Sequence, residues 1–564
     1  MTQALSIAYG EPLADEPGIG ALTLGDYLRE VTARHGPSEA LVIRGEDGMV
    51  RWTYDDLWAR SNEVARALVA CGVGKGTRVG VMTTNRMEFL STVFGTALAG
   101  GVATTLSTFS TAPELKVLLQ SSACSVLILE RKVLKRDFVA MLVELEPGIG
   151  SIAPGEIVST NFPFLKYLAM VDEENAAGAV EGWSRFIARG QSVPQAIINA
   201  RAASVFPSDP GVLFFSSGST GRPKGVLSAH RAVCIQMWRF KRVMALGDDV
   251  RTWTANGFSW SGNFAMAIGG TLSSGGALVL QRTFEPAEAL ELMAQEQVTL
   301  PLAWPHQWAQ LEAAPNFLSS DLSAIKYVDA KVPLGKHPSV HTTWIEPNRI
   351  YGNTETFTLS AAFPANTPKE ITGSRSGPPL PGNTFKIVDP LTGETMPLGE
   401  MGEIMVKGPT LMMGYVGIPL DETLDPDGFF PTGDGGFIDQ QGWLVWEGRL
   451  NDIIKTGGVN VSPFEIDAVI KTMPGVKATQ TVGVPDDLLG EIVVACIVSH
   501  DGTSLDQEGV RDFVKQQLAS YKVPRKVLFF SEDALDLTGS SKIKRSEMRK
   551  LATDRIAAEM HGFG

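Results

Sequence analysis

The chain has 564 residues, 44% of them hydrophobic, with a net charge of −13 at pH 7 and a mean hydropathy of +0.05. At roughly 100–200 residues per domain, this length predicts several domains or one large layered domain with a sizeable core. An acidic chain of this kind lacks the basic surface that a general nucleic-acid binder needs, so we expect no nucleic-acid partner.

The cysteines and the uncharged stretches of the sequence indicate where in the cell the protein is expected. The four cysteines lie far apart without the spacing of a metal site, so we expect buried thiols and a cytoplasmic protein. Residues 1–20 lack the basic and apolar segments of a signal peptide. The uncharged stretches 89–113 and 252–281 are interrupted by Gly, Ser, Thr or Asn, so we expect no membrane span, while peripheral contact with a membrane stays open.

The first part of the chain alternates helix and strand patterns. Thr23 is a capping residue before a predicted helix with one apolar face. Thr53 with Asp56 predicts a capping box before a second helix, which ends near Gly72. A strand over 78–82 follows. Strands that alternate with helices predict a mostly parallel sheet that is covered on both faces.

The later part of the chain is less regular. Residues 145–200 hold several Gly and Pro, so we expect a long surface connection there. A Gly- and Pro-rich stretch over 373–382 leads into short strands over 385–389 and 402–407, which predict a small β-rich region. After Gly448 the pattern changes to a tail that mixes strands with helices and is long enough to be a domain.

These patterns together predict an α/β fold with two domains. We expect a large N-terminal domain of layered α/β subdomains with a β-rich subregion over residues 1–448. A small α+β domain is expected over residues 449–564.

The strongest chemical signal is the segment 216–225, Ser-Ser-Gly-Ser-Thr-Gly-Arg-Pro-Lys-Gly, which follows an apolar strand over 212–215. Its glycines let the backbone turn tightly and direct N–H groups inward, while hydroxyls and a lysine add further donors and positive charge. That combination suits the phosphates of a nucleotide. It is not a Walker A loop, because the pattern GxxxxGK[ST] is absent.

Several further motifs follow this loop in order, and with it they span about residues 50 to 550. In this order they resemble the adenylate-forming superfamily, which includes acyl-CoA synthetases, firefly luciferase and the adenylation domains of peptide synthetases. The motifs at 351–355 and 432–434 are weak on their own, but the ordered set is highly specific. The matching segments are 216–225, 351–355, 432–434, 448–449, 455–463, 483–486, 490–491, 521–524 and 542–545.

The resemblance implies a nucleotide site. Tyr351 would offer its ring to adenine, with Gly352 and Asn353 beside it, while Asp434 and Arg449 would bond the ribose hydroxyls. The residues that would hold the phosphates of ATP are Ser216, Ser217, Gly218, Ser219, Thr220, Gly221 and Lys224.

The resemblance also implies the catalytic residues. Glu355, with Thr220, would hold Mg²⁺, a hard cation that prefers oxygen ligands. Thr354 would offer a hydroxyl to the α-phosphate, and Lys542 would stabilise the charge that develops during attack by the acid. Ser541 stands where the family usually has a glycine, which alters the expected path of the loop before Lys542.

A mobile C-terminal domain is a further implication of the resemblance. It would swing about a hinge at Asn451 and Asp452, in a family that usually has Asp or Lys at the first of these positions. Lys455, Gly457 and Gly458 would then line the site of thioester formation with coenzyme A. Asn tolerates unusual backbone angles, so hinging remains compatible with this sequence.

The acyl pocket is less well marked. Ser259 stands in the register where adenylation domains for amino acids carry an Asp, so we disfavour an amino-acid substrate. Ala330 and Lys331 replace glycines of the family, and aromatic side chains suit an acid with an apolar body. The predicted pocket residues are Trp253, Phe258, Ser259, Trp260, Trp304, Ala330 and Lys331.

The resemblance therefore implies an ATP-dependent acyl-CoA synthetase that forms an acyl-adenylate and passes the acyl group to CoA. The expected partners are ATP, Mg²⁺, CoA and a small fatty, aryl or alicyclic acid, and a homodimer is a further expectation. Three alternatives stay open: an acyl-AMP ligase that loads a separate carrier protein, a non-catalytic nucleotide-binding relative, and luciferase-like oxidation of an adenylate.

Overall fold

The computed structural model describes residues 4–174, 177–216, 223–456, 459–486, 489–500, 502–518, 522–531 and 545–561. The chain forms two compact units. The larger unit comprises Tyr9–Thr384 and Lys407–Phe430, and the smaller unit comprises Met1–Ala8, Phe385–Val406 and Pro431–Gly564. The contacts thus group the β-rich segments with the C-terminal residues, and the sequence boundary at residue 448 stays a prediction.

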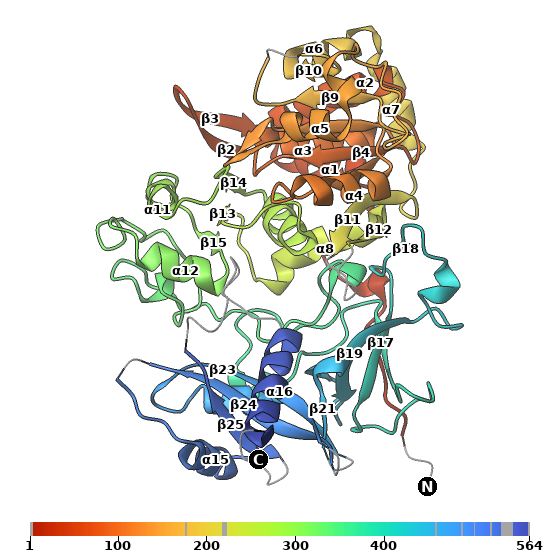
Figure 1. The fold of residues 1–564 in the computed structure, drawn as a ribbon. Coiled ribbons are helices and arrows are strands. Elements are labelled where there is room, and N and C mark those ends of the chain that lie inside the picture. Colours follow the sequence, from red (N-terminus) through yellow and green to blue (C-terminus); the bar gives the residue numbers. More distant parts are fainter. Residues whose placement is uncertain are drawn as a thin grey trace. The chain divides into compact units, whose positions relative to one another are not determined.

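The larger unit contains an eight-stranded sheet in the order β10-β9-β6-β4-β5-β11-β12-β18 (Figure 1). The first six of these strands run parallel, and β12 and β18 are antiparallel additions at one edge. The strands are β10 (Val180–Gly182), β9 (Tyr167–Met170), β6 (Val126–Leu129), β4 (Arg78–Met82), β5 (Val102–Thr105), β11 (Pro210–Ser216), β12 (Lys224–Ala229) and β18 (Gly414–Tyr415).

Helices cover both faces of this sheet, because its central strands are apolar on both sides. In β6, Val126 and Ile128 share a core with residues of α2, α6 and α7, whereas Leu127 and Leu129 share a core with residues of α4 and α5. These helices are α2 (Tyr54–Ala70), α4 (Ala112–Ser122), α5 (Phe138–Leu145), α6 (Trp183–Ala188) and α7 (Gln195–Ala203).

A second sheet of the larger unit has the order β15-β13-β14-β2-β3. Strands β15, β13, β14 and β2 run parallel, and β3 is antiparallel to β2. The strands are β15 (Leu300–Leu302), β13 (Arg251–Thr254), β14 (Ala277–Leu280), β2 (Glu39–Gly45) and β3 (Gly48–Thr53). The other helices of this unit are α1 (Leu24–His35), α3 (Met87–Leu98), α8 (His230–Val243), α9 (Ser261–Asn263), α10 (Gly270–Ser274), α11 (Pro286–Gln295), α12 (Pro305–Glu312) and α13 (Lys369–Thr372). A small hairpin joins β7 (Lys132–Val133) to β8 (Arg136–Asp137).

The smaller unit holds two more sheets. One has the order β1-β16-β17-β19-β20, and the other has the order β22-β21-β24-β23 with β25 pairing on β24. The first comprises β1 (Ile7–Tyr9), β16 (Thr384–Val388), β17 (Gly402–Lys407), β19 (Phe430–Ile438) and β20 (Leu444–Arg449). The second comprises β21 (Ile454–Thr456), β22 (Val459–Val461), β23 (Val476–Asp486), β24 (Gly490–Ser499) and β25 (Lys526–Phe529).

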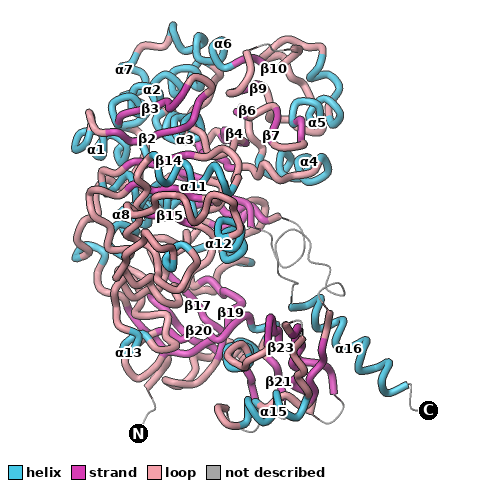
Figure 2. The backbone as a smooth tube through the Cα atoms, turned by 90° about the vertical axis from the view of Figure 1, so that its left-hand side faces the viewer, coloured by secondary structure: helices cyan, strands magenta, loops and turns pink. Residues whose placement is uncertain are grey.

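Among the described residues of the smaller unit, helices pack on the second of these sheets, and α15 (Gln507–Lys515) and α16 (Arg545–His561) are labelled in Figure 2. Helix α16 packs against β23 and β24, and α14 (Pro463–Ile470) packs against β23 and α15. Both units therefore mix helices and strands, and the predicted α/β class with a β-rich region is confirmed.

The predictions of helix starts from capping residues and of a strand from an apolar run are confirmed for α1, α2 and β4. The Thr23 side chain accepts a hydrogen bond from the Asp26 amide at the start of α1, and Thr53 with Asp56 forms the capping box of α2. The strand expected over 78–82 is β4.

The long surface connection expected over 145–200 is wrong. This stretch contributes β9 and β10 to the eight-stranded sheet and also forms α6 and α7. The two strands have only four and three residues, and β9 is apolar on both faces, so neither shows the alternation that marks a half-buried strand.

All four cysteines are free and buried, as the sequence predicts. Within the described ranges, no helix combines the length and the apolar character needed to cross a membrane.

Candidate active site

Two antiparallel strands hold the ends of the predicted phosphate loop. Ser216 ends β11 and Lys224 begins β12, and these two residues are register partners. The predicted loop residues between them, Ser217, Gly218, Ser219, Thr220 and Gly221, lie outside the described residues.

The segment that begins at Tyr351 depends on a close backbone approach. Tyr351 is 4% exposed and bridges Ala361 through backbone hydrogen bonds. A Cβ atom on Gly352 would lie 1.8 Å from the Thr358 carbonyl oxygen, so a larger residue there would displace the backbone. The Asn353 side chain accepts a hydrogen bond from the Thr356 amide at 2.9 Å and caps the short helix η6 (Thr354–Thr356).

The backbone after η6 adopts an uncommon conformation. Phe357 and Thr358 have φ values of 50° and 88°, both in the region that favours glycine. This turn returns the chain beside Gly352 and leaves Thr354 and Glu355, the predicted catalytic residues, half-buried on a fixed short helix.

Glu355 and Lys224 are linked through Tyr415. The Tyr415 hydroxyl donates to Glu355 Oε1 at 2.8 Å, and Lys224 Nζ lies 5.0 Å from the centroid of the Tyr415 ring. Tyr415 lies on β18, which pairs with β12 directly after Lys224. The larger unit thus brings together a predicted phosphate-binding cation and the predicted metal-binding carboxylate.

A cluster of three buried aromatic rings packs between these elements. Phe214 on β11 contacts Phe264 and Phe357 at ring-centroid distances of 5.7 and 5.6 Å, and all three rings are almost fully buried. Phe214 lies on β11, which leads into the predicted phosphate loop. Phe264 follows the predicted acyl residues 258–260, and Phe357 lies in the turn after Glu355. The cluster therefore fixes these three parts of the site relative to one another.

The donor set fits Mg²⁺ in part. Glu355 supplies a carboxylate whose Oε1 already accepts from Tyr415, and a magnesium site commonly uses one or two carboxylates together with phosphate oxygens and waters. Among the described residues there is no group of three His, Cys, Asp or Glu side chains that could hold a metal by itself. Thr220, the second predicted ligand, lies outside the described residues.

The two predicted ribose-binding residues face each other in the smaller unit. Asp434 on β19 is the register partner of Arg449 on β20, and Arg449 Nε lies 3.1 Å from Asp434 Oδ1. Thr432 holds the strand through its hydroxyl, which donates to the Ile404 carbonyl and accepts from the Asp434 amide. Burial and the nearby charge of Asp434 raise the pKa of Glu403.

The predicted catalytic Lys542 lies outside the described residues, but Arg545, three positions later, is firmly held. Arg545 Nη2 lies 2.9 Å from Asp467 Oδ2, its guanidinium carbon lies 4.4 Å from the centroid of the Phe464 ring, and it also donates to the Thr481 carbonyl. The chain after Lys542 is therefore anchored at a defined point.

The predicted hinge and thioester residues are only partly described. Asn451 and Asp452 lie in the short helix η8 (Leu450–Asp452), and burial raises the pKa of Asp452. Lys455 is exposed on β21, where its amide donates to Glu491 at 2.8 Å. Gly457 and Gly458 lie outside the described residues.

The predicted acyl segment is tied to the carboxyl ends of β4 and β5. The Phe258 amide donates to Asn85 Oδ1 at 3.0 Å, and the Thr105 hydroxyl donates to the Ser259 carbonyl at 3.3 Å. Ligands of open α/β sheets bind beside the carboxyl ends of the strands, so this placement agrees with a substrate segment.

The other predicted pocket residues fall into different environments. Trp253 is fully buried on β13 against Phe284, so core packing accounts for it without a ligand. Trp260 and Trp304 are 62% and 56% exposed. Ala330 and Lys331 are exposed too, and the amide of Lys331 donates to Asp329. A role of Trp260, Trp304, Ala330 and Lys331 in an acyl pocket stays a prediction.

Sequence reasoning missed Tyr415, Glu403 and Arg545 as parts of these arrangements. Tyr415 lies 60 positions from Glu355 in the chain and carries no motif of its own. Arg545 ends the motif 542–545, which predicts a role only for its first lysine. An arginine at a helix N-terminus could have indicated a partner, because a cation is unfavourable there without one.

Comparisons with known proteins agree with this arrangement. Residues 28–416 match the AMP-binding enzyme family, and residues 465–542 match the AMP-binding enzyme C-terminal domain. The first match covers more than half of the chain, so the chain belongs to the AMP-binding enzyme family.

Similar proteins of known or assigned activity align over nearly the whole chain. A feruloyl-CoA synthase of an Amycolatopsis species is 30% identical over 526 residues, which cover 92% of this chain and 97% of the relative. The putative acyl-CoA synthetase YngI of Bacillus subtilis is 28% identical over 538 residues, or 94% of this chain and 96% of the relative. The mitochondrial medium-chain acyl-CoA ligase ACSF2 of Danio rerio is 26% identical and covers 97% of this chain and 91% of its own.

Solved structures show the same fold. The ATP-bound crystal structure of MatB from Rhodopseudomonas palustris has a TM-score of 0.69 at 25% identity and covers 94% of this chain and 99% of its own. The anthranilate CoA ligase AuaEII in complex with anthranoyl-AMP has a TM-score of 0.74 at 24% identity, and covers 97% and 99%. The predicted fold class and the predicted superfamily are both confirmed.

Proposed function

We propose that this protein is an ATP-dependent acyl-CoA synthetase for a small carboxylic acid with an apolar body, with free CoA as the acceptor. The family and the relatives support the AMP-forming acid–thiol ligase that the sequence predicts. The observation that carries the proposal is the linked arrangement of Lys224, Tyr415 and Glu355 on elements that also hold the phosphate-loop ends.

The first half-reaction joins the acid to AMP. A carboxylate oxygen attacks the α-phosphorus of ATP, the bond from that phosphorus to the bridging oxygen breaks, and pyrophosphate leaves with the electron pair. Both reactants are anions, so the site must supply positive charge and donors. In this proposal Lys224 contributes such charge at the phosphates, and Thr354 offers its hydroxyl to the α-phosphate. Mg²⁺ held at Glu355 would neutralise phosphate charge when bound.

The second half-reaction moves the acyl group to sulfur. The CoA thiolate attacks the acyl carbonyl, the carbon–oxygen bond to AMP breaks, and acyl-CoA and AMP are the products. We assign Asp434 and Arg449 to the ribose, Lys542 to the first step, and Lys455, Gly457 and Gly458 to the second. A hinge at Asn451 and Asp452 would move the C-terminal domain between the pose that presents Lys542 and the pose that presents Lys455, Gly457 and Gly458.

The acid class follows from charge and aromaticity. Ser259 lacks the carboxylate that would pair with an α-ammonium group, which disfavours an amino-acid substrate. The relatives include a feruloyl-CoA synthase and a medium-chain acyl-CoA ligase, whose named acids have an aryl or an alkyl body. We therefore propose a fatty, aryl or alicyclic acid, and also a cytoplasmic location and a homodimer.

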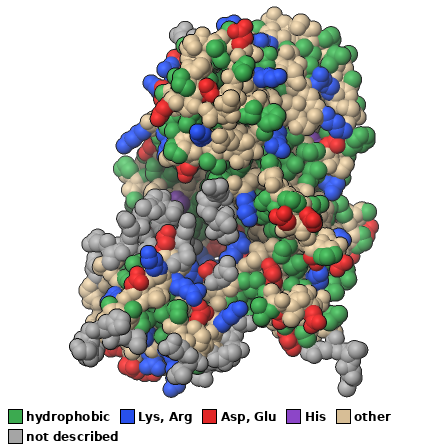
Figure 3. Space-filling view, turned by 45° about the vertical axis from the view of Figure 1, so that its right-hand side comes forward, with side chains coloured by type: hydrophobic (Ala, Val, Ile, Leu, Met, Phe, Trp, Pro, Cys, Tyr) green, Lys and Arg blue, Asp and Glu red, His purple; other side chains and the backbone are tan. Residues whose placement is uncertain are grey.

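No nucleic-acid partner is part of this proposal. On the face drawn in Figure 3, basic and acidic side chains are interspersed over the surface. This distribution, together with the net charge of −13, supports a small-molecule enzyme over a nucleic-acid binder.

The test measures pyrophosphate release from ATP and Mg²⁺ with a panel of fatty, aryl and alicyclic acids, with and without CoA. We expect acid-dependent release that turns over repeatedly only with CoA and that yields acyl-CoA. Release that needs a carrier protein in place of CoA would show an acyl-AMP ligase. ATP binding without release for any acid would contradict a catalytic role.

A further inference from the structure

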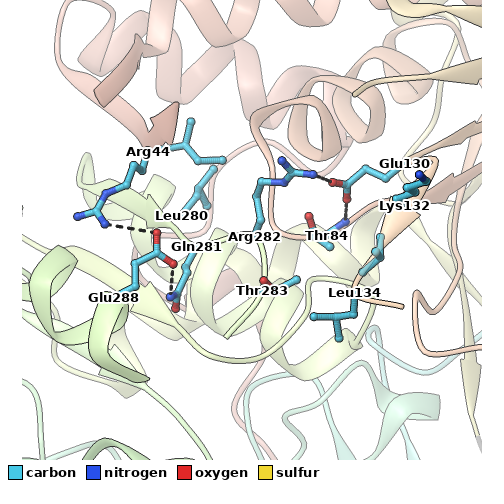
Figure 4. A pocket seen from close by; sticks show the side chains of 12 residues that line it. Arg44, Thr84, Glu130, Lys132, Leu134, Leu280, Gln281, Arg282, Thr283 and Glu288 are labelled. Atoms are coloured by element: carbon cyan, nitrogen blue, oxygen red, sulfur yellow. Dashed lines mark hydrogen bonds and ion pairs between the residues drawn. The ribbon is translucent and has the colours of Figure 1, made fainter. Parts of the chain in front are cut away.

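A cavity of about 390 Å³ lies in the larger unit, apart from the residues assigned above (Figure 4). Four parallel strands from both sheets of this unit lead to it. Thr84 and Glu130 follow β4 and β6, Arg282 follows β14, and Arg44 lies near the end of β2. The carboxyl ends of parallel strands are the usual place for a small ligand in α/β proteins, and this volume is that of a small-molecule pocket.

The carboxylate at one end of the cavity is fully neutralised. Glu130 has no exposed side-chain surface, and it accepts from Arg282 Nη2 at 2.7 Å, from Arg86 Nη1 at 3.2 Å and from the Thr84 amide. Arg282 is 47% exposed and keeps further N–H donors beyond the one given to Glu130. Arg86 also pairs with Glu88 at 3.0 Å, so the two cations and two carboxylates of this cluster balance, and the exposed part of Arg282 is the cation that faces the cavity.

Lys132 adds a second cation to this end. It lines the cavity from the β7–β8 hairpin, and its side chain is exposed. Within the described part of the chain no carboxylate lies within ion-pair distance of Lys132, so its charge is not neutralised by a neighbour.

The opposite end of the cavity carries one more carboxylate than cations. Glu288 lies 3.5 Å from Arg44 and accepts from Gln281 Nε2 at 2.8 Å (Figure 4). Arg44 also pairs with Glu291 at 3.2 Å. The charge of the cavity is thus asymmetric, with the excess of cations beside Glu130.

Two buried polar atoms of the lining have no hydrogen-bond partner among the described residues. Thr84 is 8% exposed and its hydroxyl oxygen is unpartnered, and Gln281 is 5% exposed and its side-chain oxygen is unpartnered. Buried polar groups are almost always hydrogen-bonded, and leaving them unpaired is costly. A ligand that accepts from Thr84 and donates to Gln281 would satisfy both.

We propose that this cavity binds a small molecule that carries a phosphate monoester and a hydroxyl or amine. The phosphate accepts from Lys132, from the remaining donors of Arg282 and from the Thr84 hydroxyl. The hydroxyl or amine of the ligand donates to Gln281 Oε1. Binding here does not depend on which acid the enzyme activates.

The first test measures binding by calorimetry with glycerol 3-phosphate as the probe and acetate as the comparison. We expect glycerol 3-phosphate to bind the wild-type protein, and Lys132→Gln to weaken that binding about tenfold or more, because a charge-assisted hydrogen bond is lost. Thr84→Val should weaken it several-fold without lowering the melting temperature, since the hydroxyl it removes has no partner in the protein.

Lys135→Gln is the matched control. Lys135 is exposed in the same hairpin but does not line the cavity, so its replacement should leave binding unchanged. Equal binding of the probe to all four proteins would place it elsewhere and overturn the proposal. So would acetate that binds as tightly as glycerol 3-phosphate, or no binding of the probe to the wild-type protein at millimolar concentration.

A second measurement separates two sources of the phosphate, and this arm rests on the proposed function. CoA carries a 3′-phosphate, so the KM for CoA is compared with the KM for 3′-dephospho-CoA in each variant. A KM that rises in Lys132→Gln for CoA alone assigns the site to the phosphate of CoA. Unchanged kinetics together with lost binding of glycerol 3-phosphate assigns it to a separate phosphate compound. Because binding is measured without turnover, an inactive protein leaves the first test intact.

Discussion

The Tyr415 hydroxyl holds Glu355 in place through one hydrogen bond, while the same ring lies beside the Lys224 ammonium. A single side chain therefore touches both charges that the larger unit contributes to the proposed site. Its two contacts can be separated by substitution, because one uses the hydroxyl and the other uses the face of the ring.

Tyr415→Phe should slow ATP–pyrophosphate exchange by about ten- to a hundredfold, because a hydrogen bond to a charged group contributes about 1.5–3 kcal/mol. The ring beside Lys224 is kept, so the melting temperature should change little. Tyr415→Leu, which also removes the ring, should be slower than Tyr415→Phe. Exchange at the wild-type rate in Tyr415→Phe would mean that the hydroxyl does not position Glu355.

Gly352→Ala should lower both stability and exchange. The added Cβ would lie 1.8 Å from the Thr358 carbonyl oxygen, so the backbone beside Glu355 must move, and such overpacking commonly costs about 1–3 kcal/mol. Gly148→Ala is a suitable control, since the nearest atom to its Cβ would be 3.8 Å away. Thermal unfolding and exchange measured on both variants test this, and similar values for the two would contradict it.

Glu403→Gln should change how stability depends on pH. Burial and the charge of Asp434 raise the pKa of Glu403 in the folded protein, so the folded state binds the proton more tightly than the unfolded chain. The contribution of this carboxyl to stability is therefore present below its unfolded pKa and is lost as the pH rises through the folded pKa.

Glu403→Gln removes this titration and can still accept from the Gly433 amide. The variant should gain stability relative to the wild-type protein as the pH rises from 4 to neutral, by the same linkage, from an unfolded pKa of about 4.3. Melting temperatures across this range measure the difference, and a gap that widens toward acid pH would contradict the assignment.

At the scale of elements, Arg545 joins α16 to α14 and β23. Its guanidinium contacts Asp467 and the Phe464 ring, and it donates to the Thr481 carbonyl. The side chains of Arg545 and Asp467 are 11% and 6% exposed, so the pair is largely removed from water.

Arg545→Ala should destabilise the smaller unit by about 3–5 kcal/mol, because it leaves the Asp467 carboxylate buried without its partner. The double variant Arg545→Ala/Asp467→Asn should recover part of this loss, since the unpaired charge is then gone. Denaturant unfolding of the single and double variants gives the two values. A double variant as unstable as the sum of the singles would exclude this explanation.

The elements that were predicted correctly are those that local rules define. Thr23 and Thr53 mark the starts of α1 and α2 through caps that need only three neighbouring residues. The strands β9 and β10 were missed because their pairing with β6 and with each other is decided by residues far along the chain.

The residues of the candidate site also differ in whether local sequence identifies them. Motifs predict Ser216, Lys224 and Glu355 as site residues, but no motif predicts Tyr415, because this tyrosine reaches Glu355 only when β18 pairs with β12. Trp253 shows the reverse case. A buried core tryptophan and a pocket tryptophan have the same sequence signal, and only burial separates them.

For the whole molecule, the decisive prediction concerns the two half-reactions. Lys542→Ala should slow adenylation by about two to three orders of magnitude, because a charged donor to the transition state is lost. Pre-formed acyl-adenylate should still react with CoA at close to the normal rate in this variant. Single-turnover assays of each step measure both, and an equal loss in the two steps would rule out this division of labour.

The pairing of β1 with β16 has a consequence for biosynthesis. The Ser6 carbonyl accepts from the Ile387 amide, so the first strand of the smaller unit meets its neighbour only after a further 381 residues have been added. At roughly 5–20 residues per second, translation leaves this strand without its pairing edge for roughly 20–75 s. During that interval the nascent chain exposes an unpaired strand edge, which can pair with another chain until β16 has been made.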